Sequence, residues 1–177
     1  ERMADPAIRI VTLTVTEKAY LRNRDGGLDL AHSDIIWDLA NPRSPRTIHG
    51  LLVGALGERR RKGIPPFTVL CCDNLPANGE TLRGLVLQFS KAGDGDLAAH
   101  IERDVAFPST MVDRIVPATT DADRERISAA IRLDDAWPVK TEPFMQWVIE
   151  DHFPQGRPSW EKFGVEMVED VRPYEEM

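Results

Sequence analysis

Two apolar runs in the first half of the chain are typical of buried strands. The segment AIRIVTLTV, residues 7–15, contains β-branched and apolar residues without a helical period, which predicts a largely buried strand. A second run of the same character lies in PFTVLCCDN, and its apolar part ends at Cys72. Nearer the C-terminus, WVIED and GVEMVEDV predict later strands.

Segments with helical spacing lie between these runs. SDIIWDLAN predicts a short helix that begins at Ser33. SPRTIHGLLVGALGERRRKG predicts a longer helix, with Ser44 as N-cap, Pro45 in its first position and Gly63 as C-cap. Its basic run ERRRKG falls in the last turn, where cations offset the helix dipole, so we interpret it as a solvated helix end.

The next helix, NGETLRGLVLQFSKAG, is predicted to have Asn78 as its N-cap. Its apolar residues fall on one helical face: Leu82, Leu85, Val86 and Phe89. Further helices are predicted over residues 96–103 and 121–131. Because strands and helices alternate with short links, the sequence predicts an α/β fold with a doubly wound, mainly parallel sheet and flanking helices.

Composition and charge limit the classes of partner. The chain has 177 residues, of which 42% are apolar and 29% charged, as in ordinary soluble globular proteins. A net charge of -7 provides no electrostatic footprint for nucleic acid or an anionic membrane, so we expect neither partner. No apolar run approaches the roughly 20 residues of a membrane span, and no secretion pattern opens the chain, so we expect a cytoplasmic protein.

The cysteines and histidines indicate no metal centre. Cys71 and Cys72 are adjacent in a strand pattern, where successive side chains point to opposite faces. We therefore expect no disulfide and no zinc site, but small buried thiols in a reducing compartment. The four histidines are scattered without ligand spacing, and we expect no metal.

Polar residues directly after the strands are the first candidates for a site. Asp73 and Asn74 follow the second strand, and ligands of such folds bind beyond the carboxyl ends of the strands. An Asn amide there can stabilise negative charge that develops on a substrate oxygen. The alternative is a turn in which Asn74 bonds its own backbone. Thr16 and Glu17 follow the first strand in the same way, although a lone Thr-Glu pair is weak.

Charged residues within apolar or acidic surroundings are further candidates. Asp113 and Arg114 stand inside VAFPSTMVDRIVPATT, where an ionised group is costly unless it is paired or binds a ligand. A structural salt bridge is the alternative. The C-terminal VEDVRPYEEM crowds carboxylates near Tyr174, and such a cluster either relays protons or starts a solvated helix.

The aromatic residues Phe144, Trp147, Phe153 and Trp160 are expected to pack together in a core or at a domain interface.

No cofactor or nucleophile motif completes an active site from these residues alone. The sequence lacks G-x-G-x-x-G, a Walker loop, G-x-S-x-G and a Cys-His nucleophile arrangement. Five segments taken in order, however, resemble the mannitol dehydrogenase family of polyol-specific long-chain dehydrogenases: TVTEKAY, TVLCCDNLPANG, FPSTMVDRIVPATT, DDAWPVKTEPFMQWVIED and RPSWEKFGVEMVEDVRPYEEM. The resemblance covers essentially the whole chain, and the stretch from Val105 to Pro117 resembles the family's own signature.

The resemblance implies metal-independent hydride transfer between NAD or NADP and a secondary alcohol. Asn74 would be one half of an oxyanion hole, and Asp113 would hydrogen-bond hydroxyl groups of the substrate. Glu175 would gate proton traffic to the catalytic base. Val112, with Thr16 and Glu17, would lie near the nicotinamide half of the cofactor.

The resemblance also implies that parts of the family's protein lie outside this sequence. The family's glycine-rich phosphate loop lies upstream of the matching segments, and its catalytic lysine directly follows YEEM. We therefore expect residues 1–177 to be the C-terminal portion of a Rossmann-like NAD(P)-binding domain, the second half of its sheet. They would end just before that lysine and a helical C-terminal domain, and would normally pack against the missing parts.

Several alternatives stay open at the level of sequence. The substrate is a small polyol or sugar acid, mannitol/fructose or mannonate/fructuronate, and the two pairs differ by a carboxylate that a cationic side chain would bind. NAD and NADP are not distinguished, and neither is the oligomeric state. A different class of function is a catalytically incomplete binding or scaffold module derived from the same fold.

Overall fold

The computed structural model describes residues 2–176. Its N-terminal half contains two parallel strands, β1 (Ile10–Leu13) and β2 (Thr68–Cys71). Their register runs from Ile10 opposite Thr68 to Leu13 opposite Cys71. Every residue of β2 is buried, as a central strand with both faces covered requires. Both strands therefore lie inside the two predicted apolar runs.

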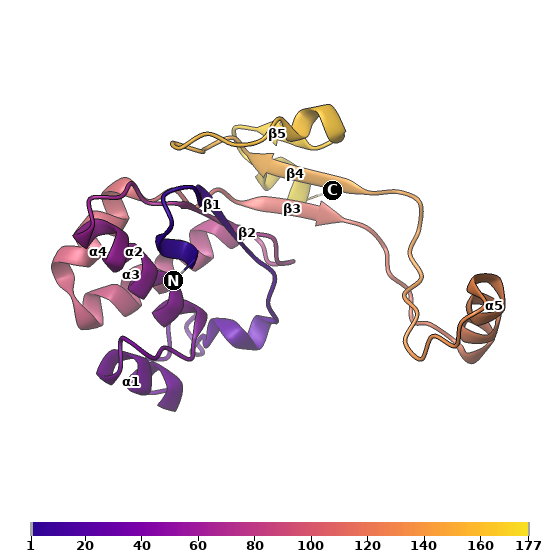
Figure 1. Ribbon diagram of the computed structural model, residues 1–177, viewed down its shortest axis with the longest axis horizontal. Coiled ribbons are helices and arrows are strands. Elements are labelled where there is room, and N and C mark those ends of the chain that lie inside the picture. The colour runs from indigo at the N-terminus through magenta and orange to yellow at the C-terminus, as the bar shows by residue number, and fades with distance from the viewer. Residues whose placement is uncertain (1, 177) are drawn as a thin grey trace.

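Four helices gather beside β1 and β2 (Figure 1). They are α1 (Ser33–Ala40), α2 (Ile48–Arg61), α3 (Asn78–Gly93) and α4 (Gly95–Asp104). The predicted apolar face of α3 is buried in full: Leu82, Leu85, Val86 and Phe89. Strands enclosed by alternating helices confirm the predicted α/β class. No helix within residues 2–176 is long and apolar enough to cross a membrane.

A second sheet forms from the C-terminal part of the chain. It contains β3 (Thr110–Asp113), β4 (Gln146–Glu150) and β5 (Glu166–Val168). β3 and β4 pair antiparallel, whereas β4 and β5 pair parallel. The backbone N–H of Val69 donates to the carbonyl of Ala106 at 3.0 Å, so the segment that leads into β3 runs alongside β2. The second sheet is thereby attached to the first.

Within residues 2–176, three one-turn 3-10 helices and two further α-helices complete the fold. The 3-10 helices are η1 (Arg2–Ala4), η2 (Glu17–Tyr20) and η3 (Trp160–Phe163). The α-helices are α5 (Asp121–Ile131), which has the predicted bounds, and α6 (Arg172–Glu175). Figure 1 shows α5 far from the other helices, at the end of a long excursion between β3 and β4.

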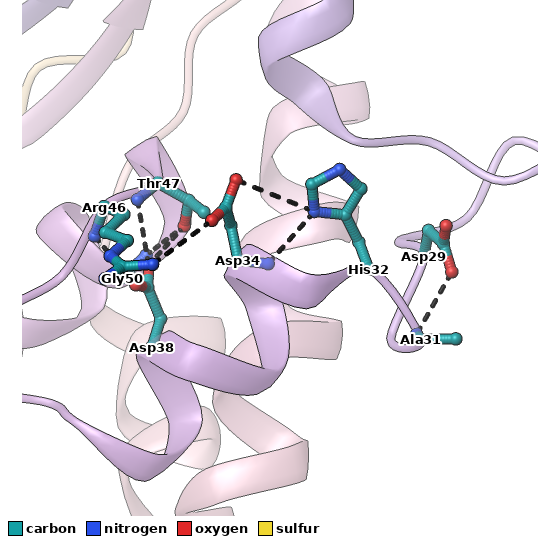
Figure 2. Close-up of polar contacts among 8 residues, drawn as sticks. All are labelled: Asp29, Ala31, His32, Asp34, Asp38, Arg46, Thr47 and Gly50. Atoms are coloured by element: carbon teal, nitrogen blue, oxygen red, sulfur yellow. Dashed lines mark hydrogen bonds and ion pairs between the residues drawn. The ribbon is translucent and has the colours of Figure 1, made fainter.

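The predicted start of α2 is wrong by three residues because a buried carboxylate holds the preceding chain outside the helix. Asp38 of α1 accepts the backbone N–H groups of Arg46 at 2.7 Å and Thr47 at 2.9 Å, and the Thr47 hydroxyl at 2.7 Å. Thr47 is therefore the N-cap in place of Ser44, and its hydroxyl accepts the N–H of Gly50 (Figure 2). A Cβ at Gly50 would collide with the Asp38 carboxylate.

α1 begins at Ser33 as predicted, with His32 as its N-cap, since the imidazole accepts the N–H of Asp34 at 3.2 Å. Two other predicted helix caps differ by one residue. Lys62 is the C-cap of α2, and Gly63 follows it with a positive φ of 65°. Ala77 stands at the N-cap of α3. The predicted cap, Asn78, instead lies buried in the first turn of α3, where its side chain forms hydrogen bonds with β3.

Two expectations about exposure also change. The basic end of α2 is not solvated throughout, because the guanidinium of Arg59 is buried and donates to the carbonyls of Asp5 and Ile8 at 2.7 Å. Trp160 contacts Trp147 and Phe153, with ring centroids 6.0 and 5.5 Å apart. Phe144, expected in that aromatic group, is 53% exposed.

Candidate active site

A cleft of about 270 Å³ opens where β2 and β3 meet α6. Eleven residues line it: Asp73, Asn74, Leu75, Pro76, Thr110, Met111, Val112, Asp113, Gln146, Tyr174 and Glu175. Asn74, Val112, Asp113 and Glu175 were all predicted from sequence, and the structure brings them together from three separate segments. It does not bring Thr16 or Glu17 into this cleft. Glu17 lines a second, more open hollow around η2, formed mainly by residues 17–29.

Asn74 presents an unused amide to the cleft. The residue is exposed, and its side chain makes no hydrogen bond with any part of residues 2–176. The local turn is closed by backbone instead, since the N–H of Leu75 donates to the carbonyl of Asp73 at 2.9 Å. The Asn74 side chain is thus not needed for the turn, and its amide can donate to an oxygen in the cleft.

Asp73, the neighbour of Asn74, has its carboxylate turned inward. It is 7% exposed and accepts hydrogen bonds from the backbone N–H of Val15 at 2.6 Å and from the hydroxyl of Tyr20. Burial and the hydrogen bond to Asp73 raise the pKa of Tyr20, so the phenol stays protonated as the donor. Asp73 therefore joins the loop after β1 to the loop after β2.

Asn78 fixes the distance between β2 and β3. Its amide nitrogen donates to the carbonyls of Asp73 and Thr110, both at 2.8 Å, and its amide oxygen accepts the N–H of Thr110 at 2.9 Å. The Thr110 hydroxyl in turn donates to the carbonyl of Cys71 at 2.7 Å. Asn78 has no exposed surface. This set of contacts, which we name the Asn78 clamp, sets the width of the cleft at its floor.

Glu175 closes the opposite side of the cleft. Its carboxylate accepts the backbone N–H of Ala77 at 2.9 Å, at the start of the 16-residue helix α3. A helix N-terminus carries partial positive charge, so an acidic side chain is a favourable neighbour of the first turn of α3. Glu169 and Glu176 are exposed and outside the cleft lining, so the crowded acids at the C-terminus do not form one cluster.

Asp113 and Arg114 do not carry the burial cost that their apolar sequence context predicted. Both are exposed, and Asp113 forms no ion pair within residues 2–176. Arg114 donates to the carbonyl of Glu142 at 3.1 Å. Asp113 pairs directly with Gln146 across β3 and β4, so both side chains stand on the same face of the ribbon, toward the cleft.

The two cysteines supply neither a ligand set nor a nucleophile. Both are free thiols, Cys71 buried and Cys72 half-buried. Burial raises the pKa of both, to about 11 for Cys72, so both stay protonated near neutral pH. Residues 2–176 hold no group of three or more His, Cys, Asp or Glu side chains that could bind a metal ion.

Comparison with known proteins identifies the family. A sequence model described as the mannitol dehydrogenase Rossmann domain matches residues 1–162. The chain belongs to the mannitol dehydrogenase family. Membership confirms the resemblance drawn from the five segments, together with the Rossmann-like fold. The chain is 49% identical to a mannitol 2-dehydrogenase of Cereibacter sphaeroides over all of this chain and 37% of that protein. It is also 49% identical to the uncharacterized oxidoreductase YdfI of Escherichia coli, over 99% of this chain and 36% of that protein.

Two solved structures share this architecture. A substrate-free D-sorbitol dehydrogenase superposes with a TM-score of 0.90 and 45% identity, over 98% of this chain and 36% of that one. A Pseudomonas fluorescens mannitol 2-dehydrogenase, solved as a ternary complex with NAD and D-mannitol, gives a TM-score of 0.88 and 48% identity, over 99% of this chain and 36% of that one. The chain therefore spans just over a third of the length of these relatives.

Two residues that line the cleft of this mannitol dehydrogenase family member were not predicted from the sequence. Thr110 and Gln146 line it, yet neither stands out in sequence. Gln146 enters only because β4 pairs with β3 in a register that places it opposite Asp113. A strand register between segments 33 positions apart carries no local sequence signal that could have found it.

Proposed function

We propose that the full protein containing this chain is a metal-independent, NAD(P)-dependent dehydrogenase of polyols. Residues 1–177 would form the C-terminal portion of its cofactor domain, next to a catalytic lysine and a helical domain that this chain lacks. The observation that carries the proposal is the cleft itself, which gathers an unbonded amide at Asn74, an unpaired carboxylate at Asp113 and a helix-anchored carboxylate at Glu175. The relative solved with NAD and D-mannitol supports the same conclusion.

The residues of the chain suit the nicotinamide end of the cofactor better than its phosphates. Leu75, Met111 and Val112 give the cleft an apolar side next to Asn74, and an aromatic ring can lie against such a surface. The sequence has no glycine-rich phosphate loop. When bound, the nicotinamide supplies hydride transfer, which belongs to the cofactor and not to the protein.

In the proposed mechanism, each polar side chain of the cleft has a separate task. The Asn74 amide donates to the reacting oxygen and stabilises the negative charge that develops there. The Asp113 carboxylate accepts hydrogen bonds from substrate hydroxyls and orients the substrate. Glu175 passes the proton between solvent and the lysine base, whose pKa must lie near neutrality for this work.

The charges of the cleft favour a neutral polyol over a sugar acid. Its lining in residues 2–176 contains the acidic side chains Asp73, Asp113 and Glu175 but no Lys or Arg. A substrate carboxylate needs a cation, and Arg binds it best. We therefore propose mannitol and fructose as the substrate pair, and mannonate and fructuronate as the alternative if the absent domain supplies a cation.

The test uses the full-length product of the native gene. Its intact mass should far exceed 19.9 kDa, and it should oxidise NADH or NADPH with fructose faster than with fructuronate. Asn74→Ala should lower kcat by about 10²-fold, as the loss of an oxyanion donor does. Asn41→Ala, which removes an amide outside the cleft at the end of α1, serves as the matched control.

Two results would overturn the proposal. A native product no longer than this chain would lack the lysine and would support the binding or scaffold module instead. A full-length protein that reduces neither sugar, or an Asn74→Ala variant as active as the control, would remove the role assigned to the cleft.

A further inference from the structure

Residues 114–145, which we name the arm, leave the body of the protein between β3 and β4 and end in α5 (Figure 1). The arm is held together by its own contacts. The N–H of Ile115 donates to the carboxylate of Glu142 at 2.7 Å, and the N–H of Glu142 donates to the carbonyl of Ile115 at 3.2 Å. Farther out, Lys140 pairs with Asp123 at 2.8 Å. These contacts give the arm a defined shape.

The surface of the arm is unusually apolar. Trp137 is 81% exposed, and Leu133 and Val139 are each 67% exposed. Ile115, Val116 and Met145 are exposed as well. No residue of α5 is buried, although it is an 11-residue helix. Monomeric soluble proteins rarely leave so many large apolar side chains on one projection, and such surfaces mark contact sites.

We infer that the arm packs against the part of the same polypeptide that this chain lacks. The inference rests on the proposal that the chain belongs to a longer dehydrogenase. The relatives are nearly three times as long as the segment they share with it. Tyr174 and Glu175 of α6, the last described helix, lie at the same cleft as the root of the arm. Polypeptide beyond α6 therefore starts beside the root of the arm.

Docking of the arm also has a consequence for the cleft. The arm departs from Asp113 on one strand and returns at Gln146 on the other, and these residues are paired in the ladder. Both line the cleft. A partner that fixes the arm thus fixes the strand end that carries Asp113. The absent region would set the substrate-binding carboxylate in place through the arm, besides any residues of its own.

The direct test is oxidative footprinting of the full-length wild-type protein by hydroxyl radicals, read by mass spectrometry. Trp137 should react several-fold more slowly than its exposure in this chain predicts, at concentrations where native mass spectrometry shows a monomer. Rapid oxidation of Trp137 would overturn the inference. Protection that appears only with dimer formation would also overturn it, because a second copy would then be the partner.

A pair of matched variants tests the link to the cleft. Leu133→Lys places a charge in the proposed contact, whereas Leu51→Lys makes the same change on an exposed position of α2. Leu133→Lys should lower the Tm and raise the KM for the polyol several-fold relative to Leu51→Lys. Equal behaviour of the two variants would overturn the link. Footprinting needs no activity, so an inactive full-length protein with a protected Trp137 would refute the proposed function and leave the packing intact.

Discussion

The carboxylate of Glu175 accepts a hydrogen bond from the backbone N–H of Ala77 at 2.9 Å, across 98 positions of sequence. This contact fastens α6 to the start of α3 and closes one wall of the cleft. Ala77 adopts a left-handed conformation with φ 44°, which costs a non-glycine residue about 1–2 kcal/mol. The residue proposed to carry protons therefore also holds the cleft together, and the two roles can be separated by substitution.

Glu175→Gln should separate them in the full-length protein. The Gln carbonyl can still accept from Ala77, so the Tm should stay close to that of the wild type. The amide cannot titrate, so kcat should fall by about 10²-fold, the low end of what a proton-transferring side chain contributes. The pH profile of kcat should change in the same variant. Glu175→Ala should lower both kcat and the Tm, and a Glu175→Gln variant with an unchanged pH profile would count against the proton role.

Asp73→Asn should destabilise the protein even though the side chain keeps its size. An amide nitrogen cannot accept hydrogen bonds, so either the N–H of Val15 or the hydroxyl of Tyr20 would lose its acceptor. A buried polar group without a partner costs about 1–3 kcal/mol. Tyr20→Phe should also destabilise the protein, because it leaves the buried Oδ2 of Asp73 with only the thiol of Cys71 as a donor, at 3.6 Å. Thermal unfolding of both variants provides the comparison, and a fully stable Asp73→Asn variant would contradict the assigned bonds.

The Asn78 clamp predicts strong coupling between two substitutions. Asn78→Ala leaves the buried N–H of Thr110 without its acceptor at 2.9 Å, while Thr110→Val removes the hydroxyl that donates to the carbonyl of Cys71 and accepts from the Asn78 amide at 3.3 Å. Residues in one hydrogen-bond network show interaction energies of about 0.5–3 kcal/mol. A double-mutant cycle in urea unfolding should therefore be non-additive, and simple additivity would show that the two residues act independently.

His49 predicts a dependence of stability on pH. Burial lowers its pKa from 6.5 to about 4, opposed only in part by Asp38, and within residues 2–176 its ring nitrogens have no hydrogen-bond partner. The unfolded chain binds the proton below pH 6.5 and the folded chain only near pH 4, so this contribution is complete at pH 7 and is lost as the pH falls between these values.

The unfolding free energy that His49 contributes should fall by about 3 kcal/mol over this pH range, at about 1.4 kcal/mol for each pKa unit. Replacement of His49 by Leu should therefore make the difference in unfolding free energy between pH 7 and pH 4.5 smaller than in the wild type. The ring also stacks on Phe89 with centroids 6.4 Å apart, so the variant is compared with itself at the two pH values. An equal pH dependence in both proteins would exclude His49 as the source.

Sequence patterns predicted the regular elements well where burial alone decides them. The apolar face of α3 is periodic and the run around β2 is continuously apolar, and both are buried as expected. Helix ends were harder to predict. The start of α2 depends on Asp38, and the place of Asn78 depends on Thr110, 32 positions away. Local propensity contains no information about such partners.

The candidate site was predictable to the extent that it follows strand ends. Asn74 stands three positions after the end of β2, and its position at the cleft needed no knowledge of pairing. Asp113 lines the same cleft, but not for the reason that its sequence context suggested. The residue is exposed and is not buried in an apolar run. Gln146 could not be predicted, since only the ladder between β3 and β4 places it there.

The contact between Glu175 and Ala77 also bears on the order of folding. Loop-closure entropy delays contacts between distant residues, and this one spans 98 positions. The pairing of β1 with β2 and the packing of α2 on α3 involve residues synthesised much earlier. On the ribosome, the first sheet and its helices can form while the last turn is still in the exit tunnel. The cleft is then the last part of this chain to be assembled, after the surrounding framework is already in place.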